Sequence, residues 1–326
     1  MEKIKLGIIG CGLAAKNLHY PALRKLRNKF EIAAVSNHTE PKAKEFSSIV
    51  GGVPYFLNYK DLLKQKDLEA VDIALPIDLN YQATKDALEA GKHVILEKPL
   101  AANLADAKIM LEFPGKYKTV MLLAENFRYK RLYNRIKEII DNGSIGKPAT
   151  FVWYTFDHVH ENEYGQIEWR RHHQYKGGFI TDGGVHSIAA IRLLFGEVTP
   201  VSALVQSINP DVGKVDTFNL QMKFENNITG SLILFFSTPY EYENRLVIFG
   251  DKGSVAADGD IITVKTYSSN RLLGDKKEIK EEIKAGNGFT EEFEDFYSAI
   301  RKGTKIKSTF EEGYKDLKTI LDALNK

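Results

Sequence analysis

The sequence predicts an α/β protein: a doubly wound parallel sheet at the amino end, followed by an α+β domain with a large, mostly antiparallel open sheet. Short, nearly all-apolar strand patterns alternate with helical patterns up to residue 124. Beyond residue 125 strand patterns dominate, and many alternate apolar and polar residues. A chain of 326 residues also exceeds the usual size of one domain. We therefore expect two domains, residues 1–124 and 125–326.

The first domain is expected to consist of buried strands joined by helices. A glycine, Gly91, stops the helix before the fourth strand, and Thr39 is placed to cap the second helix. The expected strands are 4–9, 32–36, 71–75, 93–96 and 119–124, and the expected helices are 21–29, 41–49 and 81–90. Strands of this kind indicate a parallel sheet covered on both faces.

The second domain is expected to begin with a helix over residues 132–140 and to continue mainly as strands. The strands are predicted at 150–156, 201–207, 217–224, 228–237, 245–249 and 261–266, with helices at 185–195, 290–301 and 311–324. Their alternating pattern is typical of a sheet with one open face.

Bulk composition excludes several classes of partner. The chain carries 45 basic and 43 acidic residues, a net charge of +2, which does not favour nucleic acid. The longest apolar run, 232–236, is far shorter than the roughly 20 residues that span a bilayer. The first residues lack the features of a signal peptide, and one cysteine, Cys11, suits a reducing compartment. We expect a soluble, cytoplasmic protein without nucleic-acid or membrane partners.

The residues after the first strand are typical of a dinucleotide-binding loop. This loop reads Gly10-Cys11-Gly12-Leu13-Ala14-Ala15 and leads into a helix. Gly10 permits a tight turn, and Gly12 lets the backbone approach a pyrophosphate that the helix N-terminus binds. We expect a Rossmann domain in which Gly10, Gly12, Leu13 and Ala14 contact the cofactor. The alternative is a glycine turn in another α/β fold.

The end of the second strand bears on the choice between NADP and NAD. An acidic residue there would bind the ribose 2′-hydroxyl of NAD, but this chain has Ser36-Asn37-His38-Thr39, followed by Lys42 and Lys44. These residues favour NADP, because Ser36, Asn37 and His38 can donate hydrogen bonds to a 2′-phosphate and no carboxylate repels it. The alternative is that Asn37 binds NAD and that Lys42 and Lys44 only face solvent.

A lysine and an aspartate–histidine pair are candidates for proton chemistry. Lys98 follows a buried strand, between Glu97 and Pro99, where open α/β sheets bind ligands, and Pro99 can take a cis bond. Asp182 and His186 are four residues apart, which puts them on one face of a helix. Lys98 can stabilise an alkoxide, while His186, oriented by Asp182, can act as general acid or base. The alternatives are an exposed lysine and a helix cap with a buried histidine.

Several short segments, in this order, resemble the glucose-fructose oxidoreductase, inositol dehydrogenase and rhizopine-catabolism (Gfo/Idh/MocA) family. The resemblance covers nearly the whole chain, and it includes residues 10–15, 74–76, 91–94, 97–99, 126–129, 143–146, 169–170 and 182–186. It implies a Rossmann domain, a mostly antiparallel second domain, and hydride transfer between NAD(P) and a sugar, cyclitol or related carbonyl compound. It also implies a homodimer or homotetramer assembled through the open sheet face.

The resemblance also implies roles for individual residues. Lys98, Asp182 and His186 match the catalytic group. The positions implied to lie by the cofactor are Leu75, Pro76, Glu97, Asn126, Trp169 and Arg170, the last two closing over it. Two positions depart from the family pattern: Asn80 stands where many members have histidine, and Ala190 where many have aspartate. These departures weaken the transfer of any one member's substrate to this chain.

The sequence therefore predicts an NADP-preferring (or NAD-dependent) oxidoreductase of a sugar, cyclitol or other polyol, with His186 exchanging the hydroxyl proton and Lys98 supporting the oxygen. Two other functions stay open. One is a non-redox, NAD-dependent glycoside hydrolase that oxidises and re-reduces its sugar within one cycle. The other is a cofactor-sensing regulator on the same fold. No metal is expected, because His158 and His160 lack a third ligand nearby.

Overall fold

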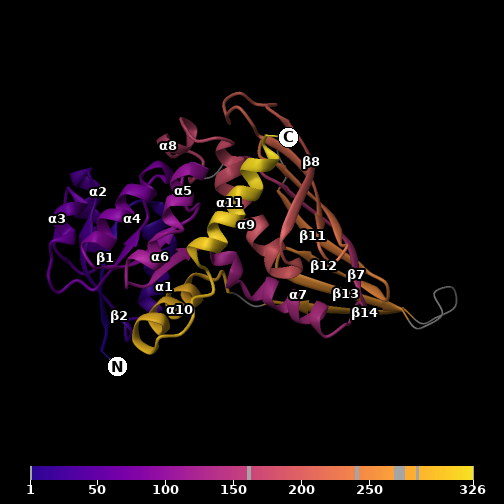
Figure 1. Ribbon diagram of the computed structural model, residues 1–326, viewed down its shortest axis with the longest axis horizontal. Coiled ribbons are helices and arrows are strands. Elements are labelled where there is room, and N and C mark those ends of the chain that lie inside the picture. Colours follow the sequence, from indigo (N-terminus) through magenta and orange to yellow (C-terminus); the bar gives the residue numbers. More distant parts are fainter. Residues whose placement is uncertain (1, 160–162, 239–241, 268–275, 284–285, 326) are drawn as a thin grey trace. The chain divides into compact units, whose positions relative to one another are not determined.

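The computed structural model describes residues 2–159, 163–238, 242–267, 276–283 and 286–325. The chain folds as two compact units (Figure 1). Unit 1 comprises Met1–Asn126 and Gly288–Lys315, and unit 2 comprises Phe127–Asn287 and Asp316–Lys326. No helix among the described residues is long and apolar enough to cross a membrane.

Unit 1 contains a parallel sheet, sheet A, with the strand order β3-β2-β1-β4-β5-β6. Its strands are β1 (Ile4–Ile9), β2 (Phe30–Ser36), β3 (Tyr55–Phe56), β4 (Ala70–Ile73), β5 (His93–Glu97) and β6 (Met121–Ala124). The order reverses at β1, which is the arrangement of a dinucleotide-binding sheet. The predicted parallel α/β architecture of this unit is therefore confirmed.

Helices connect the strands of unit 1 and bury its apolar side chains. They are η1 (Ala15–His19), α1 (Tyr20–Lys25), α2 (Glu40–Ile49), α3 (Tyr59–Leu63), η2 (Ile77–Leu79), α4 (Asn80–Glu89), α5 (Leu104–Met110) and α6 (Phe113–Lys116). The first of them, η1, is a π-helix that continues into α1. Thr39 precedes α2, but its side chain makes no capping hydrogen bond.

The structure divides the chain differently from the expected boundary at residue 124. Helix α10 (Phe289–Lys302) and the residues up to Lys315 belong to unit 1 rather than to the second domain. The reason is an apolar stripe on α10: Phe289, Phe293, Phe296 and Tyr297 recur at helical spacing and join the core beneath sheet A. A segment 165 residues beyond the last strand of the parallel sheet, Phe289 against Ala124, thus completes that sheet's core.

Unit 2 contains sheet B, with the strand order β14-β13-β12-β11-β7-β10-β9-β8. All neighbours in this sheet are antiparallel except β7 and β10, which are parallel. The strands are β7 (Pro148–Phe156), β8 (Val198–Gln206), β9 (Thr217–Phe224), β10 (Thr229–Phe235), β11 (Glu243–Gly250), β12 (Gly253–Asp258), β13 (Ile261–Tyr267) and β14 (Lys276–Glu282). The mostly antiparallel sheet is confirmed, although β12 and β14 were not predicted.

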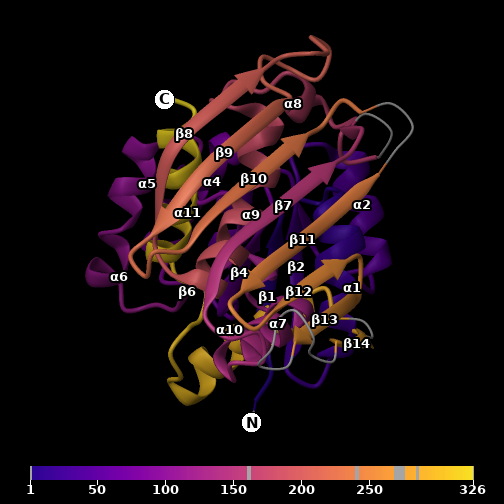
Figure 2. The ribbon, with the colours of Figure 1, turned by 90° about the vertical axis from the view of Figure 1, so that its right-hand side faces the viewer.

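Helix α9 (Gly178–Phe195), together with α7 (Arg131–Asp141) and the end of α11 (Phe310–Ala323), packs against one face of sheet B, which lies in front of α9 in Figure 2. The short helix α8 (Glu168–Arg171) buries no side chain, and a short turn, η3 (Asn126–Arg128), precedes α7. Inward side chains such as Phe218, Leu220 and Met222 are buried, while alternate residues face outward. The sheet therefore has one covered and one open face.

Helix α9 begins at Gly178, seven residues before the predicted start at residue 185. The two additional turns include Gly183 and Gly184, which follow Asp182. Both glycines pack closely: a Cβ at Gly183 would lie 3.3 Å from Phe236, and one at Gly184 would lie 3.1 Å from Ile320. Asp182 therefore lies within the helix rather than at its cap.

Candidate active site

The glycine loop of unit 1 is shaped by its backbone. Gly10 follows β1 with a φ of +103°, and a Cβ there would lie only 2.1 Å from the carbonyl oxygen of Ala74. No atom lies within 4 Å of the position that a Cβ would take on Gly12. The amide of Lys16 donates to the Gly12 carbonyl oxygen at 3.0 Å, so helical hydrogen bonding starts at the loop itself. Gly10 thus makes the close turn, and Gly12 leaves room for a phosphate.

The end of β2 is tied to the glycine loop. The backbone N–H of Cys11 donates to Asn37 Oδ1 at 3.2 Å, and Asn37 Nδ2 donates to the carbonyl oxygen of Thr39 at 3.3 Å. Ser36 is buried, whereas His38 is exposed. Both ends of the Asn37 amide therefore have protein partners, and His38 is the polar side chain here that faces solvent.

The Cys11 thiol is an inert part of the loop. Burial raises the pKa of Cys11 to about 12, an effect that the nearby Lys16 only partly offsets. Its Sγ lies 3.5 Å from the carbonyl oxygen of Ser36. A thiol held in this way fills space and is not ionised at neutral pH.

The remaining predicted cofactor residues of unit 1 follow other strands of sheet A. Leu75 and Pro76 come after β4, Glu97 ends β5, and Asn126 follows β6. Because the strands of sheet A are parallel and in register, their carboxyl ends share one edge with the glycine loop. Unit 1 thus gathers these residues at the edge where such sheets bind ligands.

Lys98 lies in a turn directly after β5, and the Lys98–Pro99 peptide bond is cis. We call residues 97–99 the Lys98 turn. Asn80, fully buried at the start of α4, donates from Nδ2 to the carbonyl oxygens of Glu97 (3.0 Å) and Pro99 (2.8 Å). The turn is therefore held on both sides of Lys98, whose own side chain is partly exposed.

A buried charged cluster that was not predicted from the sequence lies behind the Lys98 turn. His19 on η1 is fully buried, with Nδ1 2.8 Å from Asp72 Oδ2 and Nε2 2.8 Å from Glu97 Oε1. Burial alone would lower the pKa of His19, but Asp72 and Glu97 outweigh it and hold that pKa well above its ordinary value. One signal was available: Asp72 interrupts an all-apolar strand, and a carboxylate there needs a partner.

A further carboxyl group belongs to this cluster. Glu292 on α10 is fully buried, and neither of its carboxyl oxygens has a hydrogen-bond partner within the described part of the chain. Burial raises the pKa of Glu292 well above its ordinary value, against the attraction of His19. The cluster therefore sets a buried carboxyl group, whose raised pKa favours its neutral form, near a buried imidazole, whose raised pKa favours its charged form.

In unit 2, Asp182 lies on α9 and forms an ion pair. Arg170 Nε donates to Asp182 Oδ2 at 2.6 Å, and both side chains are largely buried. The Arg170 guanidinium also lies 4.5 Å from the centroid of the Trp169 ring. The predicted cofactor residues Trp169 and Arg170 are thus brought next to the predicted catalytic residue Asp182, a pairing that the sequence did not reveal.

His186 lies one helical turn beyond Asp182, as predicted. Its imidazole stacks on the Phe127 ring, with centroids 4.6 Å apart and planes 20° from parallel. The Lys130 ammonium lies 3.7 Å from the centroid of that phenyl ring. The imidazole is partly exposed, and it packs against an aromatic neighbour.

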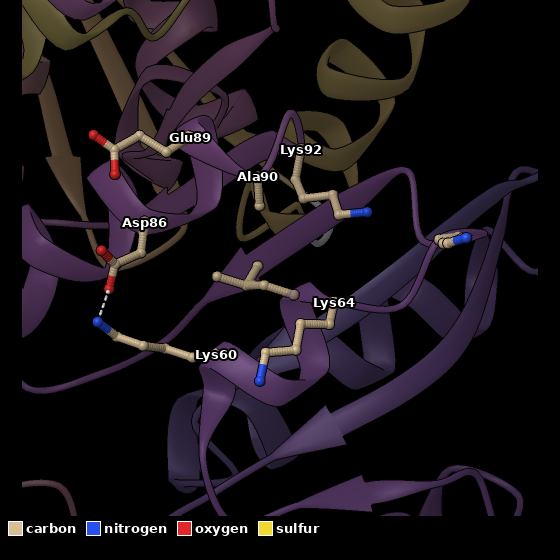
Figure 3. A pocket seen from close by; sticks show the side chains of 8 residues that line it. Lys60, Lys64, Asp86, Glu89, Ala90 and Lys92 are labelled. Atoms are coloured by element: carbon tan, nitrogen blue, oxygen red, sulfur yellow. Dashed lines mark ion pairs between the residues drawn. The ribbon is translucent and has the colours of Figure 1, made fainter.

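A shallow cavity of about 550 Å³ lies elsewhere in unit 1, lined by α3 and α4 (Figure 3). Lys60 pairs there with Asp86 at 3.1 Å, and Lys92 Nζ donates to the carbonyl oxygen of Leu68 at 2.8 Å. Lys92 and Leu68 precede β5 and β4, so this cavity lies at the amino ends of the strands. It is at the opposite edge of sheet A from the glycine loop and is not part of the candidate site.

No group of three or more His, Cys, Asp or Glu side chains in the described ranges is placed to hold a metal ion. His158 pairs by a single β-bridge with Ser237. His160 lies outside the described residues.

Comparison with known proteins matches both units to one family. Residues 4–124 match the model described as "Oxidoreductase family, NAD-binding Rossmann fold", and residues 133–256 match the GFO/IDH/MocA C-terminal domain. An uncharacterized protein of Saccharomyces cerevisiae is 30% identical over 318 residues, covering 94% of this chain and 90% of that protein. Myo-inositol 2-dehydrogenase of Thermotoga maritima is 26% identical over 260 residues, covering 78% and 75%.

Solved structures have the same fold. An oxidoreductase from Thermotoga maritima superimposes with a TM-score of 0.90 at 34% identity, covering 99% of this chain and 96% of the other. A 3-ketoreductase from Actinomadura kijaniata, solved with NADP and TDP-benzene, gives a TM-score of 0.83 at 22% identity and covers 99% and 97%. An oxidoreductase from Agrobacterium radiobacter, solved with NAD⁺, L-tartaric acid and magnesium, gives a TM-score of 0.88 at 17% sequence identity; the match covers 100% of this chain and 97% of the other. The chain belongs to the Gfo/Idh/MocA family of oxidoreductases and has the NAD(P)-binding Rossmann domain of that family.

Proposed function

We propose that this oxidoreductase transfers a hydride between NAD(P) and a carbon bearing a hydroxyl or carbonyl group in a sugar, cyclitol or related polyol. The observation that carries the proposal is the buried Arg170–Asp182 pair, one helical turn from the partly exposed His186. A family relative named for myo-inositol supports the substrate class. The residues of unit 1 fit the cofactor, because Gly12 leaves open space beside a helix N-terminus.

Each predicted catalytic residue has a distinct role in this proposal. When bound, the nicotinamide accepts or gives the hydride. In the oxidising direction His186 takes the hydroxyl proton, and the Lys98 ammonium stabilises the developing negative charge on the substrate oxygen. Asp182, held by Arg170, accepts a hydrogen bond from the substrate or orients the imidazole. In the reducing direction the same groups return the proton.

The test is a substrate screen with matched variants. Purified protein is given NAD⁺ or NADP⁺ with a panel of sugars and cyclitols, and NADH or NADPH with the corresponding carbonyl compounds, while absorbance at 340 nm is followed. We expect His186→Asn and Lys98→Met to lower kcat on the substrate found by about 10²–10⁴. The exposed residues His172 and Lys108 provide the controls, His172→Asn and Lys108→Met, which should leave kcat unchanged.

The outcomes separate the alternatives. Undiminished turnover in both Lys98→Met and His186→Asn would contradict the assigned roles. Product formed from a glycoside with no net change at 340 nm would identify the non-redox hydrolase. Cofactor binding without turnover on any compound of the panel would favour a sensor.

We also propose that the protein prefers NADP over NAD. The support is the absence of a carboxylate at residues 36–39, together with the exposed imidazole of His38. Fluorescence titration with NADPH and NADH tests this preference. Asn37→Asp keeps the acceptor that binds the Cys11 amide but adds a negative charge, so NADPH binding should weaken about tenfold or more while NADH binding is maintained. Tighter binding of NADH by the unmodified protein would contradict the preference.

A homodimer or homotetramer formed through the open face of sheet B is part of the proposal. Large apolar side chains are exposed on its strands: Leu204 is 73% exposed, Phe249 46% and Val152 37%. Such a face favours association with another surface. Light scattering after size exclusion gives the mass in solution, and Leu204→Glu should shift an oligomer towards the monomer. We place the protein in the cytoplasm, where its single thiol stays reduced.

A further inference from the structure

Two buried side chains that take no part in the proposed chemistry, Asn80 and His19, both bind the Lys98 turn. Asn80 is on α4 and His19 on η1, so the two approach the turn from different elements of unit 1. Each is fully buried. Neither was assigned a site role from the sequence, and Asn80 stands where many family members have histidine.

Asn80 holds the backbone of the turn. An amide group carries two N–H donors, and Asn80 Nδ2 lies 3.0 Å from the carbonyl oxygen of Glu97 and 2.8 Å from that of Pro99. These carbonyls belong to the residues before and after Lys98. A single side chain therefore fixes the peptide group that precedes Lys98 and the peptide group that follows Pro99, in a place where water cannot replace it.

His19 holds the side chain of the residue before Lys98. Each ring nitrogen of His19 lies 2.8 Å from a carboxylate oxygen, and Nε2 approaches that of Glu97, so the ring bridges two acidic side chains. The other carboxylate belongs to Asp72 in the middle strand β4, which pairs with β1 and β5. The Glu97 carboxylate is thereby anchored to the interior of sheet A.

A lysine side chain has four rotatable bonds, so the place that its ammonium reaches depends first on where its backbone is held. A misplacement of about 1 Å in a reacting group can cost about a hundredfold in rate. We propose that Asn80 and His19 are positioning residues that jointly fix the Lys98 turn and thereby direct the Lys98 ammonium towards the substrate oxygen. This inference rests on the catalytic role proposed above for Lys98.

The test measures the position of Lys98 without needing a substrate. The full-length protein is treated briefly with acetic anhydride, and acetylation of Lys98 relative to the exposed Lys108 is quantified by mass spectrometry. We expect Asn80→Ala to raise the relative labelling of Lys98 at least threefold, because the released turn exposes the amine. Asn80→His, which retains one N–H donor, should restore labelling towards the wild-type value.

Two further variants keep the test decisive. His19→Gln disturbs the turn through Glu97 and should raise Lys98 labelling independently, so it carries the test if Asn80→Ala fails to fold. Thr84→Val is the matched control: Thr84 is also fully buried on α4, one turn from Asn80, and none of the described hydrogen bonds joins it to the Lys98 turn. This control should leave Lys98 labelling unchanged.

Turnover on the substrate found in the screen supplies a second readout. Asn80→Ala and His19→Gln should lower kcat at least tenfold, while the Kd for NADPH or NADH changes less than threefold. If Asn80→Ala and His19→Gln fold and Lys98 is acetylated in them to the same extent as in the wild-type protein, the positioning role is overturned. Undiminished turnover in Lys98→Met would instead overturn the catalytic role proposed for Lys98, and the labelling result would then still decide whether the turn is held by these residues.

Discussion

Replacing Glu292 by glutamine tests the protonation of the buried cluster in unit 1. Glu292 is fully buried, and it is surrounded by His19 from η1, Asp72 from β4, Glu97 from β5 and Glu125 after β6. Burial raises the pKa of Glu292, so the folded protein keeps its carboxyl proton where the unfolded chain has lost it. Glutamine has the same shape and cannot ionise.

The sign and size of the effect follow from this difference in bound protons. A glutamate in the unfolded chain titrates near pH 4.3, so the stability that the neutral Glu292 provides is complete below that pH and falls as the pH rises. The loss is about 1.4 kcal/mol per pH unit for as long as the folded state retains the proton. The raised pKa of His19 acts in the same direction above its unfolded value near 6.5.

Differential scanning calorimetry between pH 5 and pH 8 measures the effect. In a domain of 150 to 250 residues, 1 kcal/mol moves Tm by about 2–4 °C, so the Tm of Glu292→Gln relative to wild type should rise by about 3–6 °C per pH unit. Glu291→Gln removes the same charge from an exposed neighbour on α10 and should show no such trend. A Tm difference for Glu292→Gln that stays constant with pH would show that the carboxyl is ionised in the folded protein and would refute this reasoning.

Three other predictions concern the two units separately. Gly10→Ala should lower the free energy of unfolding by more than about 1–2 kcal/mol in urea, because the residue has a positive φ and its new Cβ would clash with the Ala74 carbonyl oxygen. Gly12→Ala should leave Tm nearly unchanged but weaken NADPH binding about tenfold, which fluorescence titration measures. Cys11, with its pKa raised to about 12 by burial, should resist Ellman's reagent at pH 8 until urea unfolds the protein, and rapid labelling of the folded enzyme would contradict this. Asp316→Ala should cost about 3–5 kcal/mol in urea unfolding, since it deprives two buried arginines of the carboxylate they share; a loss below 1 kcal/mol would contradict it.

The sequence was sufficient to predict those elements whose residue pattern extends over only a few neighbouring positions. The apolar run 4–9 followed by Gly10 and Gly12 predicted a strand, a turn and a helix start, because the spacing of these residues alone dictates the backbone path. The four-residue spacing of Asp182 and His186 put both on one helix face. The family resemblance, carried by these segments, agreed with the later comparisons.

Short or polar elements were missed because their pattern is not distinctive. Strand β3 has only two residues, and β14 reads Lys-Lys-Glu-Ile-Lys-Glu-Glu, which lacks an apolar face. Both form because a neighbouring strand offers its backbone groups for pairing. The early start of α9 was missed for a related reason: its glycines disfavour a helix locally, and packing against Phe236 and Ile320 outweighs that preference.

Sequence by itself determined the class of fold and the position of the glycine loop at the carboxyl edge of sheet A, since both depend on local spacing, and it predicted which residues are candidates for acid–base chemistry. Only the tertiary structure decided that α10 completes the core of unit 1, that Arg170 pairs with Asp182, and that His19 joins Asp72 to Glu97. The last of these contacts link residues 53 and 78 positions apart. Burial and the pairing of buried charges select such partners, and no pattern of neighbouring residues specifies them in advance.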